Sequence, residues 1–323
     1  MIVELPNTTS AKISKALVRI REDGGAVALG RVLTLIIATE LGNEEEAIAA
    51  ANDASREHPM RVLVVSTSTA ASASEEDARV DAQIRVGGDA GASEVIVVTA
   101  YGDAALDQES LVTGLLLPDA PVVAWWPGEA PRNASQSPLG RIAQRRITDA
   151  AASASPLNAM HQMCDTYVPG DTDFAWTRLT LWRAQLAAVL DQPPYESISA
   201  VTVSGAADSP STQLLAAWLQ MQLEVPVTLT VVEGSPVPTG IHAVTLERAS
   251  GTIRLERNVA SIATLTQPGQ PVHDISLPRR SLRDCLAEEL RRLDPDSLFG
   301  EVVRRGVSAM APTHNTSTMK ATK

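Results

Sequence analysis

The chain has 323 residues, 44% of them hydrophobic, and a formal net charge of −11, so it has the length and apolar content of a globular protein of about two domains. An acidic chain is poorly suited to nucleic acid, which attracts basic surfaces, and to anionic membranes. Its apolar runs are far shorter than the ~18 residues of a membrane span and no signal peptide is recognisable, so we expect no nucleic acid or membrane partner and a cytoplasmic location.

Helices and strands alternate in the first half of the chain. Residues 7–22 place Ile13, Leu17 and Ile20 on one apolar stripe, which is typical of a helix. Residues 30–39 form an apolar run typical of a strand buried on both faces. Further patterns predict helices over 44–58, 106–117 and 139–147, and strands over 61–66, 78–86, 95–99 and 121–126.

The second half continues the alternation and ends in a polar tail. The patterns predict helices over 157–167, 173–190, 211–223, 281–293 and 297–305, strands over 197–203, 225–232 and 259–266, and a hairpin over 241–257. This order predicts an α/β fold: two α/β domains with mixed, partly parallel sheets flanked by helices.

The most linker-like stretch inside the chain is the small-residue segment 150–156. We therefore predict an N-terminal α/β domain over 1–152 and a C-terminal α/β domain over 153–310. Residues 311–323 are expected to be a disordered tail.

The residue inventory disfavours the commonest catalytic chemistries. The four lysines, Lys12, Lys15, Lys320 and Lys323, lie near the ends of the chain, which removes the P-loop pattern and makes Schiff-base catalysis improbable. The five histidines form no H-E-x-x-H motif, and the sequence has no C-x-x-C, G-x-S-x-G or G-x-G-x-x-G signature. We therefore predict no catalytic residue, cofactor or metal site.

Residues 115–128 (LLLPDAPVVAWWPG) place Trp125 and Trp126 at the carboxyl end of a predicted strand. Successive strand residues point to opposite faces, so the two rings cannot enter one core. Two interpretations remain open: helix layers on both faces bury both rings, or the rings anchor a protein interface, where Trp is enriched.

Residues 138–149 (PLGRIAQRRITD) bring Arg141, Arg145 and Arg146 within about two turns of a predicted helix. A solvated helix face with counter-ions such as Asp149 explains the pattern. Recognition of carboxylates on a partner, or of a phosphate, is the functional alternative.

Residues 168–183 (VPGDTDFAWTRLTLWR) place Trp176 and Trp182 on one helical face with leucines, which indicates core packing for both rings. Arg178 and Arg183 lie off that stripe and are candidates for surface contacts.

Residues 201–214 (VTVSGAADSPSTQL) predict a strand, a small-residue loop and a helix. Backbone N–H groups at such a helix start can hold an anion. Gly, Ser, Asp and Pro are also ordinary turn residues, so plain turn chemistry explains the same sequence.

Two cysteines, Cys164 and Cys285, are too few for a disulfide scaffold. Cys285 shares a helical face with leucines and is predicted to be a small buried hydrophobe, whereas Cys164 is expected to be more exposed.

Several of these segments together resemble the OpcA family, the glucose-6-phosphate dehydrogenase assembly proteins of actinobacteria and cyanobacteria. The residues that carry the resemblance are GRVLTLI (30–36), ASREHPMRVLVV (54–65), LLLPDAPVVAWWPGEAP (115–131), PLGRIAQRRITDA (138–150), PGDTDFAWTR (169–178) and LAEELRRLDPD (286–296). WWPG followed by AQRRITDA and PGDTD-x-AWTR is a specific combination that spans both halves.

The resemblance implies a non-catalytic accessory protein that binds glucose-6-phosphate dehydrogenase and promotes its active oligomeric form, at the entry of the oxidative pentose phosphate pathway. The cofactor NADP would then belong to the partner. Some relatives look redox-responsive, but no redox motif matches here, so that role is not carried to Cys164 or Cys285. The partner-binding surface is predicted to include Trp125, Trp126, Arg145, Arg146 and Arg178. The alternatives are a sugar-phosphate-binding enzyme or metabolite sensor, and a scaffold that leaves the kinetics of the dehydrogenase unchanged.

Overall fold

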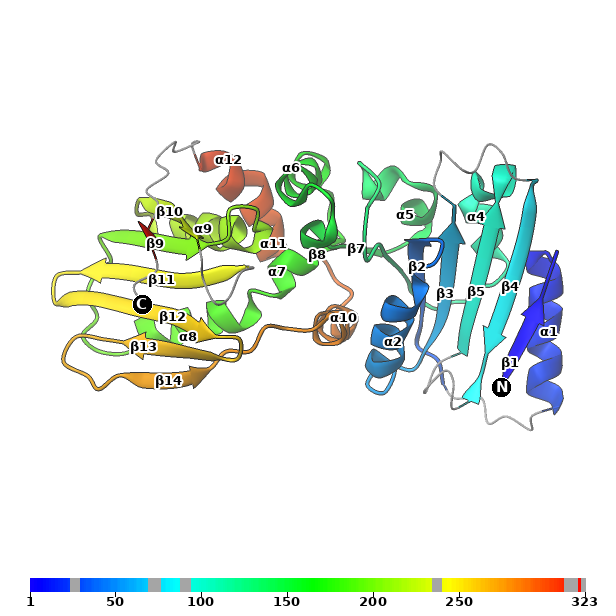
Figure 1. The fold of residues 1–323 in the computed structure, drawn as a ribbon, viewed down its shortest axis with the longest axis horizontal. Helices are drawn as coiled ribbons and strands as arrows, with labels where there is room; N and C mark the ends of the chain where they lie inside the picture. Colours follow the sequence, from blue (N-terminus) through cyan, green and yellow to red (C-terminus); the bar gives the residue numbers. More distant parts are fainter. Residues whose placement is uncertain (24–29, 69–76, 88–93, 234–239, 311–318, 321–323) are drawn as a thin grey trace. The chain divides into compact units, whose positions relative to one another are not determined.

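A computed structural model describes residues 1–23, 30–68, 77–87, 94–233, 240–310 and 319–320 (Figure 1). The chain divides into two compact units. The first comprises 1–149, 170–172 and 281–295, and the second comprises 150–169, 173–280 and 296–323. The chain leaves the first unit after residue 149, close to the predicted linker, and returns to it at 170–172 and at 281–295. The prediction of two contiguous domains divided at residue 152 did not include these two returns.

The first unit is built on an eight-stranded mixed sheet. In spatial order its strands are β1 (Ile2–Leu5), β4 (Arg79–Arg85), β5 (Glu94–Tyr101), β3 (Met60–Thr67), β2 (Leu33–Glu40), β6 (Val122–Trp125), β7 (Arg145–Thr148) and β8 (Asp171–Asp173). The β1–β4 and β4–β5 pairs are antiparallel, and β5, β3, β2, β6 and β7 run parallel.

Helices lie on both faces of this sheet, which explains the continuous apolar runs of its central strands. The helices of the unit are α1 (Ser10–Asp23), α2 (Glu44–Ala54), α4 (Gln108–Thr113), α5 (Pro138–Ile142) and α10 (Leu282–Arg291), with short η2 (Gly102–Ala105) and η3 (Ala134–Gln136). One core joins Ile13 and Leu17 of α1 to alternate residues of the strands, such as Leu63 of β3. The intervening strand residues, such as Val62 and Val64, are also fully buried and point to the opposite face, where α2 packs against β3 and α10 packs against α2.

The second unit contains a seven-stranded sheet of mostly antiparallel character. Its order is β14 (His273–Ser276), β13 (Ile262–Thr266), β12 (Gly251–Val259), β11 (Ile241–Arg248), β9 (Ala200–Gly205), β10 (Val227–Glu233) and β15 (Met319–Lys320). The β9–β10 and β10–β15 pairs are parallel, and the remaining pairs are antiparallel. Burial alternates along β12 and β13, as expected for strands with one face in the core.

The helices of the second unit cover the apolar side of that sheet. They are α6 (Pro156–Thr166), α7 (Phe174–Thr177), α8 (Thr180–Leu190), α9 (Pro210–Leu223), α11 (Ser297–Glu301) and α12 (Val307–Ala309), with η4 (Ala150–Ala152) and the π-helical turn η5 (Val302–Gly306). Trp176, Trp182 and Phe299 are buried in one core with Val203 and Leu255 of the sheet. The core packing predicted for both tryptophans is thus confirmed.

Both sheets are mixed, partly parallel and flanked by helices, which confirms the predicted α/β fold class. Several predicted bounds were wrong. The helix expected over 139–147 ends at Ile142, where Ala143 turns extended, and the chain then forms β7 beside β6. The helix expected over 173–190 is two helices, α7 and α8, separated by a short turn. Most of the predicted tail, 311–318 and 321–323, lies outside the described residues.

Candidate functional site

The two adjacent tryptophans are buried inside the first unit. Trp125, the last residue of β6, is fully buried, and Trp126 is 5% exposed. Trp126 belongs to the core beneath α1 and α5, and its backbone N–H donates to Ile147 O at 3.0 Å. This placement matches the interpretation in which helix layers bury both rings, and a role in partner binding stays a prediction.

Arg145 on β7 is held in a buried polar network. Its Nη2 and Nε donate to Glu289 Oε2 of α10, with 3.2 Å between Nε and Oε2, and its Nη1 donates to Asp294 O at 2.9 Å. Thr172 Oγ1 donates to the other carboxylate oxygen of Glu289 at 3.3 Å. The guanidinium is therefore bound by the chain's own acceptors, and it ties α10 and 170–172 to β7.

Arg146, the next residue, is fixed by a second ion pair. Its Nε donates to Asp171 Oδ1, and its Nη1 donates to Ala143 O at 2.8 Å. Gly170 has a φ of +100°, and a Cβ at this position would lie 2.6 Å from Gln144 O and 2.8 Å from Arg146 Nη2. Glycine is thus required both by the backbone conformation and by the close approach of β7.

These two ion pairs explain why an arginine-rich segment lies inside the unit. Arg145 and Arg146 are 4% and 7% exposed, and burial of a guanidinium is tolerated where a carboxylate and further acceptors surround it. Both partners are distant in sequence, which is why the sequence alone favoured a solvated helix face. Arg141, by contrast, is an exposed residue that pairs with Glu109 at 3.0 Å.

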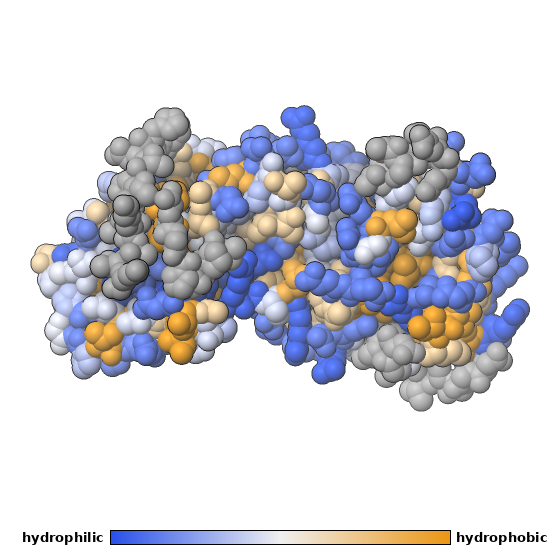
Figure 2. All heavy atoms as spheres, viewed as in Figure 1, coloured by the Kyte–Doolittle hydropathy of each residue, from blue (hydrophilic) through white to orange (hydrophobic). Residues whose placement is uncertain are grey.

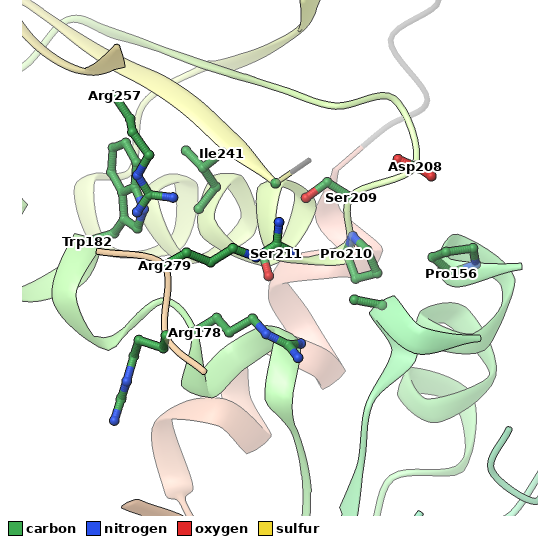
Figure 3. A pocket seen from close by; sticks show the side chains of 13 residues that line it. Pro156, Arg178, Trp182, Asp208, Ser209, Pro210, Ser211, Ile241, Arg257 and Arg279 are labelled. Atoms are coloured by element: carbon green, nitrogen blue, oxygen red, sulfur yellow. The ribbon is translucent and has the colours of Figure 1, made fainter. Parts of the chain in front are cut away.

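Arg178, the fifth predicted residue, lies in the second unit and lines a pocket of about 100 Å³. The pocket also contains Arg257, Arg279, Arg280 and Trp182, together with the first residues of α9 (Figure 3). Arg178 follows α7 and is partly exposed. The structure thus separates Arg178 from the other four predicted residues, all of which are buried in the first unit.

Arg257 was missed by the sequence analysis. It occupies an inward position of β12, in alternation with Ile253 and Leu255, and is 5% exposed. Its guanidinium lies over the Trp182 ring, 5.1 Å from the centroid, which is a cation–π arrangement. Burial, and then the nearby charge of Arg279, lower the pKa of Arg257 from 12.5 to about 10. The sequence signal for Arg257 is that it stands where the alternation Ile253, Leu255 calls for an apolar, inward-facing residue.

The first turn of α9 lies at the same pocket. Ser209 caps the helix by accepting from Thr212 N at 3.1 Å, and Ser211 Oγ donates to Ala175 O at 2.9 Å. These residues belong to segment 201–214, for which the sequence allowed two interpretations, anion binding and ordinary turn chemistry. The capping serine accounts for the turn, and the structure also brings four chain-distant arginines to the pocket at the helix start.

The two cysteines lie in different helices, Cys164 in α6 and Cys285 in α10. Burial, followed by the charges of Asp173 and Asp165, raises the pKa of Cys164 to about 12, so its thiol stays protonated near neutral pH. Cys285 is fully buried in α10, as predicted, and neither cysteine forms a disulfide within the described residues.

Two further features concern the described residues. None of their helices combines the length and the apolar character that crossing a bilayer requires. Across the same residues, no group of three or more His, Cys, Asp or Glu side chains is placed to bind a metal ion.

Comparison with known proteins connects both units with one enzyme. A family model described as the N-terminal domain of a glucose-6-phosphate dehydrogenase subunit matches residues 51–165, and one described as its C-terminal domain matches 169–303. Comparison with curated proteins gives no significant match.

Among solved structures, the chain is similar to KijD10, a 3-ketoreductase from Actinomadura kijaniata, at 9% identity and a TM-score of 0.45, covering 90% of this chain and 100% of that one. It is also similar to an oxidoreductase from Sinorhizobium meliloti at 10% identity and a TM-score of 0.41, covering 84% and 86% of the two chains. At these TM-scores the likenesses imply nothing about activity.

Proposed function

Because the chain belongs to the OpcA family of glucose-6-phosphate dehydrogenase subunits, we propose that it is a non-catalytic accessory subunit that binds this dehydrogenase and promotes its active oligomeric assembly. The observation that carries the proposal is the pair of family matches over 51–165 and 169–303, which involve both units. The protein then acts at the entry of the oxidative pentose phosphate pathway, in the cytoplasm.

The residue inventory supports this division of labour. The sequence lacks the P-loop, zinc and nucleophile-elbow motifs of the commonest enzymes. In this proposal the dehydrogenase carries NADP and the reacting groups, and the accessory subunit contributes binding energy only.

Activation by a bound subunit requires differential contacts with two states of the enzyme. A subunit that binds the inactive and active forms equally shifts nothing, and a shift from 1% to 99% active requires about 10⁴-fold tighter binding to the active form. We therefore expect association with the active oligomer to be much tighter than association with the inactive form.

The burial pattern divides the five residues predicted to bind the partner. Trp125, Trp126, Arg145 and Arg146 are buried, so in this proposal they act by shaping the first unit. Arg178 is partly exposed and is retained as a direct contact. On the viewed face of each unit hydrophilic residues predominate and apolar residues form small separate groups, so hydropathy marks no interface on that face (Figure 2). Interfaces of non-obligate partners are typically no more apolar than the rest of the surface.

Reconstitution tests the proposal directly. The purified chain and the dehydrogenase from the same cell are mixed, and mass by light scattering is measured beside kcat and KM. We expect co-elution at a higher mass and a rise in kcat/KM. Failure to associate at ~10 µM of each protein would contradict the proposal, and association without a kinetic change would identify a scaffold.

The alternative, a sugar-phosphate-binding enzyme or a metabolite sensor, is favoured by one observation, the arginine-lined pocket of the second unit. Turnover of a pentose-pathway metabolite by the isolated chain would establish the enzyme and overturn the accessory role.

A further inference from the structure

The geometry points to an anion-binding pocket in the second unit that takes a phosphate group, either inorganic phosphate or the phosphate monoester of a small metabolite. The pocket lies between the first turn of α9 and the side chains of Arg178, Arg257 and Arg279 (Figure 3). The proposal concerns the isolated chain and does not depend on binding to the dehydrogenase.

Arg257 is the strongest indication of a ligand. Its side chain is more than nine-tenths buried, and its Nε has no hydrogen-bond partner among the described residues. Over the same residues no ion pair joins it to a carboxylate, and its observed contact is with the face of Trp182. Burial of a guanidinium costs free energy unless an acceptor compensates it. An anion bound in the pocket would supply the negatively charged acceptor that the described residues do not give Arg257.

The helix start provides a second, independent donor. α9 has 14 residues, so it is long enough for its dipole and its unpaired first N–H groups to favour an anion. Pro210 at the first helical position has no N–H, and Thr212 N is taken by the Ser209 cap. The Ser211 N–H, in the first turn, has no acceptor within the helix.

The side chains around the pocket are predominantly positively charged. Four arginines line it, and Asp208, the one carboxylate among its described lining residues, is exposed. Arg280 is partly engaged, because its Nη1 donates to Thr177 O at 3.2 Å. In Figure 3 the Arg279 side chain extends toward Ser211 and the Arg178 guanidinium lies below it, whereas the Arg257 guanidinium lies beside the Trp182 ring.

These donors match a phosphate better than a carboxylate. Donors that converge from several directions suit a tetrahedral group with three terminal oxygens, and guanidinium forks bind phosphate oxygens in pairs. A volume of about 100 Å³ is enough for a phosphate group with some water, because one water molecule takes up only ~10–15 Å³ of such a cavity volume.

Calorimetric titration of the purified full-length chain tests the inference. The ligands are inorganic phosphate, glucose 6-phosphate and unphosphorylated glucose, at an ionic strength matched with sodium chloride. We expect phosphate to bind and glucose not to bind. At ~100 times Kd, phosphate should raise Tm by about 5 °C. Tighter binding of the sugar phosphate than of inorganic phosphate would identify the ligand as a phosphorylated metabolite, and equal or weaker binding would identify the free ion.

Three variants locate the site. Arg279→Ala changes an exposed side chain, and Arg257→Met keeps the bulk over Trp182 but removes the charge. Each is expected to weaken phosphate binding about tenfold or more, since one charge-assisted hydrogen bond has about that effect. Arg305→Ala is the matched control, because it removes an exposed arginine of the same unit outside the pocket and should change Kd less than about twofold.

Absence of phosphate binding up to ~10 mM in the wild-type chain would overturn the inference. Equal weakening by Arg279→Ala and Arg305→Ala would also overturn it, because the binding would then follow overall charge. Reconstitution with the dehydrogenase is unaffected by either result, so the two proposals fail separately.

Discussion

Buried arginines occur in both units, and their partners differ. In the first unit Arg145 and Arg146 lie against Glu289 and Asp171. In the second unit Arg257 lies over an aromatic ring, and within the described residues no carboxylate pairs with it. The comparison teaches that arginine burial alone does not identify a functional site. A buried guanidinium with a carboxylate of its own belongs to the fold, whereas one without a carboxylate is available to a ligand.

The largest expected effect tests whether the buried residues Trp126 and Arg146 stabilise the fold of the first unit. Trp126→Ala combined with Arg146→Ala removes a buried ring and leaves Asp171 without its ion pair, and we expect a loss of more than ~5 kcal/mol in unfolding free energy. Circular dichroism and thermal melting measure it. Arg141→Ala, an exposed change in the same segment, is the control and should stay within ~0.5 kcal/mol. A double variant that melts like the wild type but no longer co-purifies with the dehydrogenase would instead support direct partner contact.

The second prediction concerns Arg145 and Glu289. Arg145→Ala or Glu289→Ala alone should cost about 3–5 kcal/mol, because each leaves an uncompensated buried charge. The double replacement Arg145→Met with Glu289→Leu should cost less than either single change, since no buried charge remains. Urea denaturation of the three variants measures the difference. Additive losses would show that the pair does not act as a unit.

The third prediction is that removing the buried charge of Arg257 causes little or no loss of stability, in contrast to the two preceding changes. Arg257→Met should leave unfolding free energy within ~1 kcal/mol of wild type, or raise it, because it removes a buried charge that no carboxylate of the described residues compensates. Chemical denaturation without phosphate measures it. A loss as large as that of Arg145→Ala would mean that Arg257 is a structural residue, and the contrast between the units would disappear.

The smallest expected effect is a pH dependence. The pKa of Arg257 is about 10 in the folded chain and 12.5 as its ordinary value, so the unfolded state binds more protons between these values. Stability of the wild type relative to Arg257→Met should therefore rise as pH increases through about 10, whereas the burial cost is fully present at neutral pH. Denaturation of both proteins at several pH values between about 9 and 11 measures it. Parallel curves would contradict the lowered pKa.

Local patterns predicted much of the fold. The apolar stripe through Trp176 and Trp182 correctly placed both rings in the core, because its period is set by the helical backbone. The hairpin predicted over 241–257 is formed by β11 and β12. The family resemblance was also visible in the sequence and is confirmed by the family matches.

The long-range ion pairs were not predictable in the same way. Strand β7 looked helical because its arginines resemble a solvated face, and the carboxylates that neutralise them come from β8 and α10. The pocket combines residues from the ends of α7, β12 and α9, which no local period connects. Arg257 alone carried a local signal, as a charged residue in the inward phase of β12.

The return of α10 to the first unit has a consequence for synthesis on the ribosome. Leu286 and Leu290 of α10 are buried, and Glu289 neutralises Arg145, so the first unit lacks part of its core until residue 295 has been translated. The amino-terminal half cannot complete its folding early, as an independent leading domain does. Nearly the whole chain must leave the exit tunnel before either unit is finished, and an amino-terminal fragment that stops at residue 152 is expected to be captured by chaperones and degraded.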